Sequence, residues 1–194
     1  MAHNGRNTTI LLVEDERIVS LAEQQMLTRD GYHVIVADSG EAALQTVRRN
    51  TNIDLILMDI DLGGGIDGTE AAERILAIRA VPIVFLTSHQ EREIVERTQD
   101  LTNYGYVVKD SGEFVLLESI RMALELFRAH TTARRTATQL RALFDAATDP
   151  IFVVNASLRV VLANNAAIRL AEPGPQSPEG RNFAEIYPEH ADGM

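Results

Sequence analysis

The stretch that decides the fold is Leu55-Ile56-Leu57-Met58-Asp59, four consecutive apolar residues that end on an acid. A continuous apolar run, in contrast to an alternating one, is typical of a strand that helices cover on both faces. Gly63-Gly64-Gly65 follows shortly afterwards, so no helix is expected directly behind Asp59. In open α/β sheets, ligands bind beyond the carboxyl ends of the strands. Asp59 is therefore the first candidate for a functional residue.

Four further apolar runs flank this stretch, at 9–13, 34–37, 83–86 and 106–108. Amphipathic segments separate the runs, and four residue pairs have the spacing of a helix N-cap and an acidic third helical residue. These pairs are Asp38 with Glu41, Asp67 with Glu70, Ser88 with Glu91, and Asp110 with Glu113. Five successive β-then-α units predict a parallel sheet with right-handed crossovers. The sequence therefore predicts an α/β fold with a doubly wound, five-stranded parallel sheet.

Composition excludes several functional classes. The chain has 194 residues, a net charge of -10 and no cysteine. The acidic balance argues against binding to nucleic-acid phosphates or to an anionic membrane, and the lack of cysteine excludes disulfides and zinc-thiolate sites. No stretch approaches the roughly 20 apolar residues of a membrane span, and residues 1–8 lack the apolar core of a signal peptide. We expect a cytoplasmic protein that binds neither nucleic acid nor membrane and has a disordered N-terminus at 1–8.

The chain changes character after about Glu113. Residues 114–144 contain neither Gly nor Pro, which predicts one long helix. Several apolar residues fall near a 3–4 spacing, a weak coiled-coil pattern; they are Leu116, Ala123, Leu126, Ala133, Ala137, Leu140 and Phe144. We expect either a linker helix over 114–147 that supports a homodimer, or a terminal helix that packs on its own domain.

Beyond Asp149-Pro150 a new pattern begins. Apolar runs at 151–154 and 160–162 predict two strands around a turn, and a short helix is expected at 164–170. About 45 residues with two strands are too few for an independent core. This segment has the pattern of the beginning of a second domain.

Polar residues follow four of the predicted strands: Glu14 and Asp15, Asp59, Thr87, and Lys109. Parallel strands bring their carboxyl ends to one edge of the sheet, so these side chains are expected to converge. Three carboxylates at close range repel one another unless a cation neutralises them. With oxygen ligands alone, Mg²⁺ fits best. A carboxylate beside Mg²⁺ can attack phosphorus, and a lysine is a suitable point charge for a phosphoryl oxygen.

Each of these residues also has a purely structural explanation. Glu14 and Asp15 could begin a helix, where acids interact favourably with the helix dipole. A threonine after a strand is usually structural, and a lysine there is usually a solvated surface charge. The combination at the ends of successive strands favours a functional site.

These motifs resemble the receiver domain of two-component response regulators over about Thr8 to Arg128. The matching pieces are the runs from Ile10 to Glu16 and from Leu55 to Leu62, the pair Asp67-Gly68, and the runs from Ile83 to Ser88 and from Gly105 to Lys109. The resemblance implies a flavodoxin-like fold with strand order 2-1-3-4-5. It also implies a signalling protein and not an enzyme with an external substrate.

The same resemblance implies the role of each site residue. Asp59 is the phosphoacceptor, and Mg²⁺ is bound by Glu14, Asp15, Asp59 and the backbone carbonyl of Asp61. Lys109 binds the phosphoryl group. Thr87 is the switch hydroxyl and Tyr106 the aromatic residue that responds to it, while Asp61 and His89 tune dephosphorylation. The phosphoryl donor is a histidine kinase or a phosphotransfer protein.

Two departures from the family pattern affect this site. The usual Met-Pro pair after the acceptor is replaced by Leu62-Gly63-Gly64-Gly65, with one residue more before Asp67, which predicts a more mobile loop. Asp110 replaces the usual cis proline after the lysine, and a cis bond before a non-proline residue costs about 2.5–4 kcal/mol. The geometry of the Lys109 loop therefore cannot be transferred from the family.

The segment from Leu143 through Asn165 resembles the opening of a PAS sensor domain. The sequence then predicts a receiver domain at 9–128, an extended last helix at 114–147 and a partial α+β PAS domain at 148–194. Such an arrangement resembles the front part of a multidomain sensory kinase or a related regulator.

Two alternatives come from other functional classes. A Mg²⁺-dependent aspartyl-phosphate phosphatase also uses an acid at a strand end and a second acid two residues later, where Asp61 stands. Glu14 and Asp15 and the absence of a cap domain favour the receiver. The other alternative is a dimeric interaction module that never receives phosphate.

Overall fold

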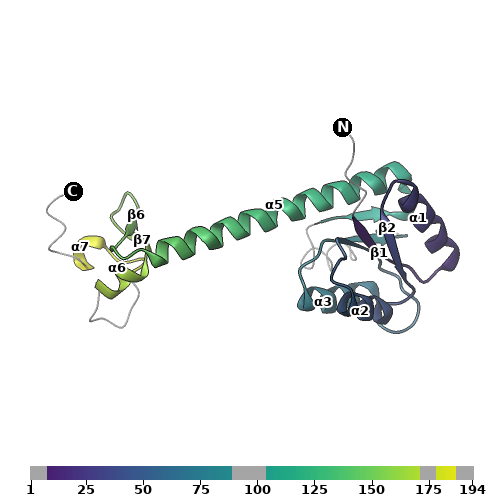
Figure 1. Ribbon diagram of the computed structural model, residues 1–194, viewed down its shortest axis with the longest axis horizontal. Helices are drawn as coiled ribbons and strands as arrows, with labels where there is room; N and C mark the ends of the chain where they lie inside the picture. The colour runs from purple at the N-terminus through teal and green to yellow at the C-terminus, as the bar shows by residue number, and fades with distance from the viewer. Residues whose placement is uncertain (1–7, 89–103, 171–177, 187–194) are drawn as a thin grey trace. The chain divides into compact units, whose positions relative to one another are not determined.

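The computed structural model describes residues 8–88, 104–170 and 178–186 (Figure 1). The chain divides into two compact units, Met1–His130 and Thr131–Met194, and each is described by itself. Thr8, the last residue of the predicted disordered terminus, is buried, and its carbonyl accepts a hydrogen bond from the His33 N–H at 3.0 Å. None of the described helices is long and apolar enough to cross a membrane.

The first unit contains a five-stranded parallel sheet with the order β2-β1-β3-β4-β5, as predicted. Its strands are β1 (Thr9–Val13), β2 (His33–Ala37), β3 (Leu55–Asp59), β4 (Ile83–Thr87) and β5 (Tyr106–Val108). The register pairs Val13 with Met58, Asp59 with Leu86, and Thr87 with Val108. The residues that follow β1, β3, β4 and β5 therefore lie along one edge of the sheet.

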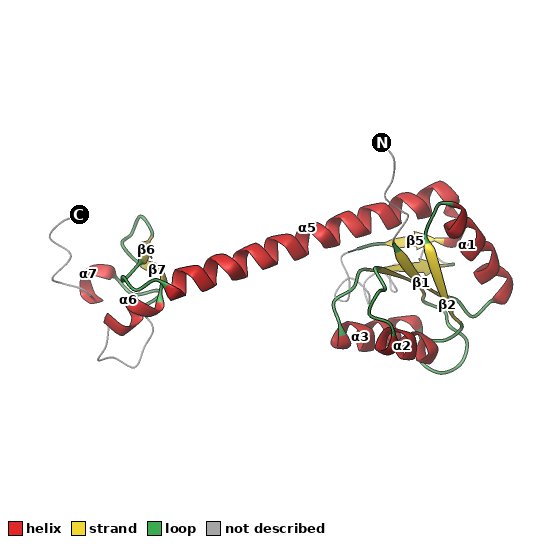
Figure 2. Cartoon of the chain, in the orientation of Figure 1, coloured by secondary structure: helices red, strands yellow, loops and turns green. Residues whose placement is uncertain are grey.

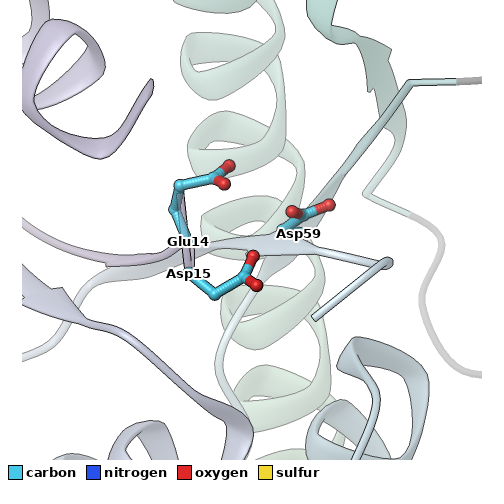
Figure 3. A group of neighbouring side chains, drawn as sticks. All are labelled: Glu14, Asp15 and Asp59. Carbon is cyan, nitrogen blue, oxygen red and sulfur yellow. The ribbon is translucent and has the colours of Figure 1, made fainter. Parts of the chain in front are cut away.

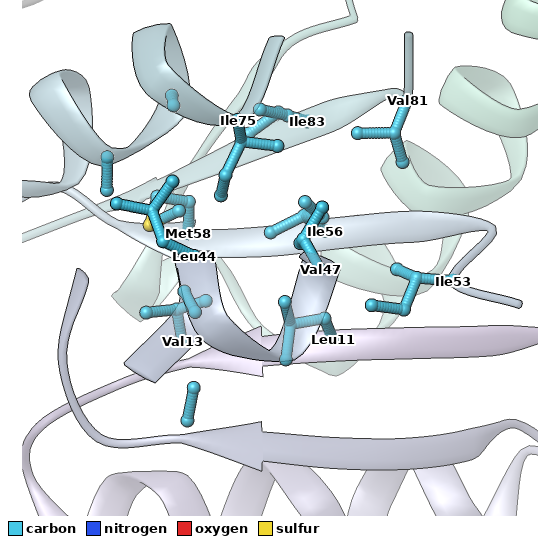
Figure 4. Packing of buried hydrophobic residues seen from close by; sticks show 14 of the residues in the cluster. Leu11, Val13, Leu44, Val47, Ile53, Ile56, Met58, Ile75, Val81 and Ile83 are labelled. Atoms are coloured by element: carbon cyan, nitrogen blue, oxygen red, sulfur yellow. The ribbon is translucent and has the colours of Figure 1, made fainter. Parts of the chain in front are cut away.

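Helices cover both faces of this sheet, which explains why its strands are continuous apolar runs (Figures 1 and 2). The helices α2 (Gly40–Arg49) and α3 (Gly68–Ile78) pack on one face, and α1 (Arg17–Arg29) and the first part of α5 (Glu113–Ala146) pack on the other. Figure 4 shows the first face, where Ile56 and Met58 of β3 meet Leu44 and Val47 of α2. Alternate residues of β3, Leu55 and Leu57, belong to the opposite face.

Of the predicted helix N-caps, one is confirmed and two are wrong. Asp67 is the predicted N-cap of α3, and its Oδ1 accepts from the Glu70 N–H at 2.8 Å. The N-cap of α2 is Ser39 and not Asp38, because the extended backbone of Ser39 lets its hydroxyl accept from Ala42. The prediction of Asp110 as an N-cap is also wrong, since Asp110 lies inside the short 3-10 helix η2 (Lys109–Ser111). The pair Ser88 and Glu91 extends outside the described residues.

The second unit contains a two-stranded antiparallel sheet of β6 (Phe152–Val154) and β7 (Val160–Ala163), followed by α6 (Asn165–Leu170) and α7 (Phe183–Ile186). The two strands and the helix after them agree with the prediction. Its small core consists of Val160, Ala163, Ala167 and Phe183. The buried amide of Asn164 lies between β7 and α6.

Candidate functional site

Three carboxylates meet at the carboxyl edge of the sheet. Glu14 and Asp15 directly follow β1, and Asp59 is the last residue of β3. Glu14 and Asp59 are almost completely buried, at 1% and 2% exposed, and Asp15 is half-buried. One oxygen from each lies within 4.8 Å of the others, and the three side chains lie close together (Figure 3). The convergence expected from the strand ends is therefore present.

Lys109 supplies the positive charge that this cluster requires. It follows β5, and its Nζ donates hydrogen bonds to Glu14 Oε2 at 2.7 Å and to Asp59 Oδ2 at 2.8 Å. Burial by itself lowers the pKa of Lys109, but the hydrogen bonds to Asp59 and Glu14 outweigh it and hold the pKa above its ordinary value. Lys109 is therefore charged and bridges two of the three acids.

Burial raises the pKa of Glu14, and the hydrogen bond from Lys109 opposes this shift. A second acid, Glu23 on α1, shows the same effect more strongly. Burial and the charge of Glu14 raise its pKa to about 7, and its buried Oε2 accepts no hydrogen bond from the described residues. Sequence reasoning missed Glu23, since an acid inside an amphipathic helix carries no signal that it points inward.

The donor set fits a hard divalent cation. The three acids offer oxygen ligands only, and the ammonium of Lys109 already binds to two of them as a positive charge. Mg²⁺ is commonly held by one or two carboxylates together with waters and phosphate oxygens. Glu14, Asp15 and Asp59 are the residues that would hold it. Asp61 lies beside them: its N–H donates to Asp59 Oδ1 at 3.2 Å, and its side chain is exposed.

Two of the remaining predicted residues lie on the strands next to β3: Thr87 on its neighbour β4, and Tyr106 on β5 beyond it. Thr87 is the last residue of β4 and is buried. It directly follows Leu86, which pairs with Asp59 in the sheet. Tyr106 begins β5, is half-buried and stacks on Phe85 with ring centroids 6.5 Å apart. His89 lies outside the described residues. The peptide bond between Lys109 and Asp110 is trans, like every other in the described part of the chain.

The loop between β3 and α3 is bound to the cluster. The Gly63 N–H donates to Asp15 Oδ2 at 3.0 Å, and Gly64 and Gly65 have φ values of 76° and 86° that favour glycine. Gly68 has a different requirement, because a Cβ atom there would lie 1.9 Å from the carbonyl oxygen of Asp59. Only glycine allows the start of α3 to approach the acid so closely.

The family model for the response regulator receiver domain matches residues 10–121. The three acids of the cluster and Lys109 lie within this range. The chain belongs to the response regulator receiver family. A model for the PAS fold matches residues 138–192, so this receiver domain is followed by a PAS segment. The predicted order of receiver, long helix and PAS segment is thereby confirmed.

Similar proteins agree with this assignment. The transcriptional regulatory protein PdtaR of Mycobacterium tuberculosis is 32% identical over 63% of this chain and 59% of its own length. The chain thus spans less than two thirds of that relative. The N-terminal domain of a response regulator/sensory box/GGDEF three-domain protein from Carboxydothermus hydrogenoformans is 43% identical, with a TM-score of 0.60 over 64% of this chain and 99% of that domain.

A third similar protein was solved in complex with ligands. The response regulator TrrA of Thermotoga maritima, in complex with Mg²⁺ and BeF, is 28% identical to this chain. Its TM-score is 0.55 over 60% of this chain and 98% of TrrA.

Proposed function

We propose that this receiver takes a phosphoryl group onto Asp59 from a phosphohistidine of a histidine kinase or phosphotransfer protein, with Mg²⁺ bound at Glu14, Asp15, Asp59 and the Asp61 carbonyl. One observation carries the proposal: a buried carboxylate is held between two further acids and a charged lysine at the end of β3. A purely structural acid at this place would not require two additional carboxylates. The complex of TrrA supports the choice of cation.

The proposed step is a displacement at phosphorus. A carboxylate oxygen of Asp59 forms the new P–O bond, and the P–N bond to the imidazole of the donor breaks. The imidazole keeps the electron pair and takes up a proton from solvent. Bound Mg²⁺ would offset the negative charge of the entering group. Lys109 already donates to Asp59 and can donate to a phosphoryl oxygen instead.

The donor needs a docking surface beside Asp59. A groove of about 1050 Å³ extends from Asp15 along α1 and is lined by Ile18 and Leu21. Ile18 is 86% exposed and Leu21 55% exposed, although both are large and apolar. Arg17, Ser20 and Gln24 line the same groove, so exposed apolar side chains alternate with polar ones next to the acidic cluster. Such a mixed helix face fits the amphipathic helix of a phosphohistidine-bearing partner.

Phosphorylation is proposed to shift the receiver between two states. The new dianion attracts the Lys109 ammonium and the Thr87 hydroxyl, and the aromatic ring of Tyr106 responds to the movement of β4. Because Lys109 begins η2 and α5 begins shortly after it, the change is passed to α5 and along the 114–147 helix to the PAS segment. The exposed Leu140 and Leu143 of this helix support a homodimer through it.

The domain limits follow from the same assignment. We assign the receiver to 9–128, with its last helix extended over 114–147, and the partial PAS domain to 148–194. The relatives are regulators, and we propose that this chain likewise promotes its own phosphorylation and dephosphorylation and turns over no external substrate.

The test is to incubate the full chain with Mg²⁺ and acetyl phosphate and to measure the added phosphate by intact mass spectrometry. The wild type should gain one phosphate, and Asp59→Asn should gain none. Asp61→Asn, which changes an exposed acid two residues away, should still be labelled. Equal labelling of Asp59→Asn and the wild type would show that the acceptor is wrong.

Two further arms test the finer parts of the proposal. Chelation of divalent ions should abolish labelling, and a phosphorylated histidine phosphotransfer domain should replace acetyl phosphate as donor. Multiple turnovers of a generic phosphoester would instead identify a phosphatase.

A further inference from the structure

The loop between β3 and α3 is held from two sides by acids of distant segments. On one side, the Gly63 N–H donates to Asp15 Oδ2 at 3.0 Å. On the other side, the Ile66 N–H donates to Glu41 Oε1 at 3.1 Å. Glu41 lies in the first turn of α2, 25 residues earlier in the chain. The loop is thus fastened both to the acidic cluster and to a helix outside it.

Packing at the Glu41 side is close. A Cβ atom on Gly65 would lie 2.5 Å from Glu41 Oε1, and one on Gly40 would lie 2.6 Å from the Ile66 side chain. The start of α2 therefore fits directly against the loop. The loop itself has little stiffness, since Gly64 and Gly65 can adopt many backbone conformations. An external contact is needed to keep such a loop in one conformation.

The position of the loop affects two of the three carboxylates. Gly63 binds an oxygen of Asp15, and the Asp61 N–H binds an oxygen of Asp59. A shift of the loop therefore reorients acids that are proposed to hold the cation and to accept phosphate. We infer that Glu41 is a positioning residue, which fastens the Gly-rich loop and thereby sets the affinity of the acidic cluster for a divalent cation. This inference rests on the proposed function of Asp59.

A simpler explanation for Glu41 is that an acid in the first turn stabilises its own helix. The contacts favour the positioning role. Ser39 already caps α2 through the Ala42 N–H, whereas Glu41 binds the N–H of another segment. A helix-stabilising acid would contribute to stability without changing the behaviour of the loop or of the cation site.

The two roles are separated by Glu41→Ala, with Glu41→Gln as the conservative variant, both in the full chain. Glutamine keeps an oxygen that can accept from Ile66 but loses the charge. Gln45→Ala is the matched control, because Gln45 is an exposed residue one turn further along the same helix. Three quantities are measured: amide exchange of Ile66 and Gly63 without metal, the Mg²⁺ dissociation constant by NMR titration, and the rate of labelling by acetyl phosphate against Mg²⁺ concentration.

In Glu41→Ala, exchange of the Ile66 amide and the Mg²⁺ dissociation constant should each rise about three- to tenfold, the range expected from one hydrogen bond. The labelling rate should fall at low Mg²⁺ and recover to within about twofold of the wild type at saturating Mg²⁺. Glu41→Gln should recover most of the amide protection, and Gln45→Ala should match the wild type.

The inference is overturned if Glu41→Ala retains helix α2 and binds Mg²⁺ as tightly as the wild type. It is also overturned if the variant loses stability while exchange at Ile66 stays unchanged. If the wild type itself accepts no phosphate, the proposed function fails. Amide exchange and Mg²⁺ affinity still decide the role of Glu41 in that case.

Discussion

In the receiver unit, apolar side chains cover both faces of a five-stranded sheet. The described part of the C-terminal unit has a core of only four apolar residues, together with one buried amide. Every residue of β3 and β4 in the receiver is buried. In the C-terminal unit, β6 has no fully buried residue, and Val160 and Ala163 are the buried residues of β7. Burial of apolar area thus contributes far more to the first unit than to the second.

The C-terminal unit depends instead on Asn164, which is completely buried. Its Oδ1 accepts from the N–H groups of Ile151 at 3.0 Å and Ala167 at 2.9 Å. Its Nδ2 donates to the carbonyls of Asp149 at 2.9 Å and Ala147 at 3.4 Å. One side chain therefore joins the segment before β6 to the start of α6. A small unit with two strands is marginal on apolar burial alone, so each satisfied polar contact matters more.

The largest effect is expected from breaking the apolar core of the receiver. Phe85→Ala removes a completely buried side chain from β4 and should lower the free energy of unfolding by about 3–5 kcal/mol. Urea unfolding followed by circular dichroism measures the change. Phe114→Ala, where the side chain is 76% exposed, should change stability by less than about 0.5 kcal/mol. Similar losses in the two variants would contradict the predicted importance of this core.

A smaller effect is expected in the C-terminal unit. Asn164→Ala removes the four hydrogen bonds of a buried side chain, and one buried polar group that loses its partner costs about 1–3 kcal/mol. We expect a loss of about 2–3 kcal/mol that is confined to this unit. Hydrogen exchange should show lost amide protection in β6, β7 and α6, with protection in β1 and β3 unchanged. The exposed neighbour Asn165 gives the control Asn165→Ala, and equal losses in both variants would argue against the role of the buried amide.

The smallest effect is expected from Glu23, an acidic side chain that is partly buried in the otherwise apolar packing of the receiver. Its pKa is about 7 in the folded protein against an ordinary value of 4.5, so between these pH values the folded state keeps a proton that the unfolded chain has released. The contribution of Glu23 to stability is therefore greatest below pH 4.5 and is lost as the pH rises to about 7.

Glu23→Gln removes this dependence. At pH 8 the variant should have a free energy of unfolding about 1 kcal/mol higher than that of the wild type, and this gain should vanish near pH 4.5. The gain is small because the side chain is partly exposed and solvent screens its charge. Thermal unfolding across this pH range without divalent ions measures the difference. Glu73→Gln, on the exposed face of α3, is the control; a gain that is equal at all pH values would exclude titration of Glu23 as the cause.

Much of the fold could be read from local sequence. The apolar runs predicted all seven described strands to within one residue, because a short apolar run bounded by turn residues indicates a strand whether or not both of its faces are buried. The helix starts were less predictable. Ser39 and Asp38 are both good N-cap residues, and the extended backbone of Ser39 decides between them. Asp110 has the right spacing but follows β5 too closely, and η2 forms there instead.

By itself, the sequence determined which residues end the strands, and so it placed Glu14, Asp59, Thr87 and Lys109 at one edge. Strand periodicity and parallel order are sufficient for that conclusion. The tertiary structure alone decided that Lys109 bridges Glu14, 95 residues away in the sequence, and Asp59, 50 residues away. It alone placed Glu41 against the Gly-rich loop, where Glu41 accepts a hydrogen bond from Ile66. It alone decided that Glu23 points inward. These features depend on how side chains from distant segments pack, and no local pattern of residues encodes that packing.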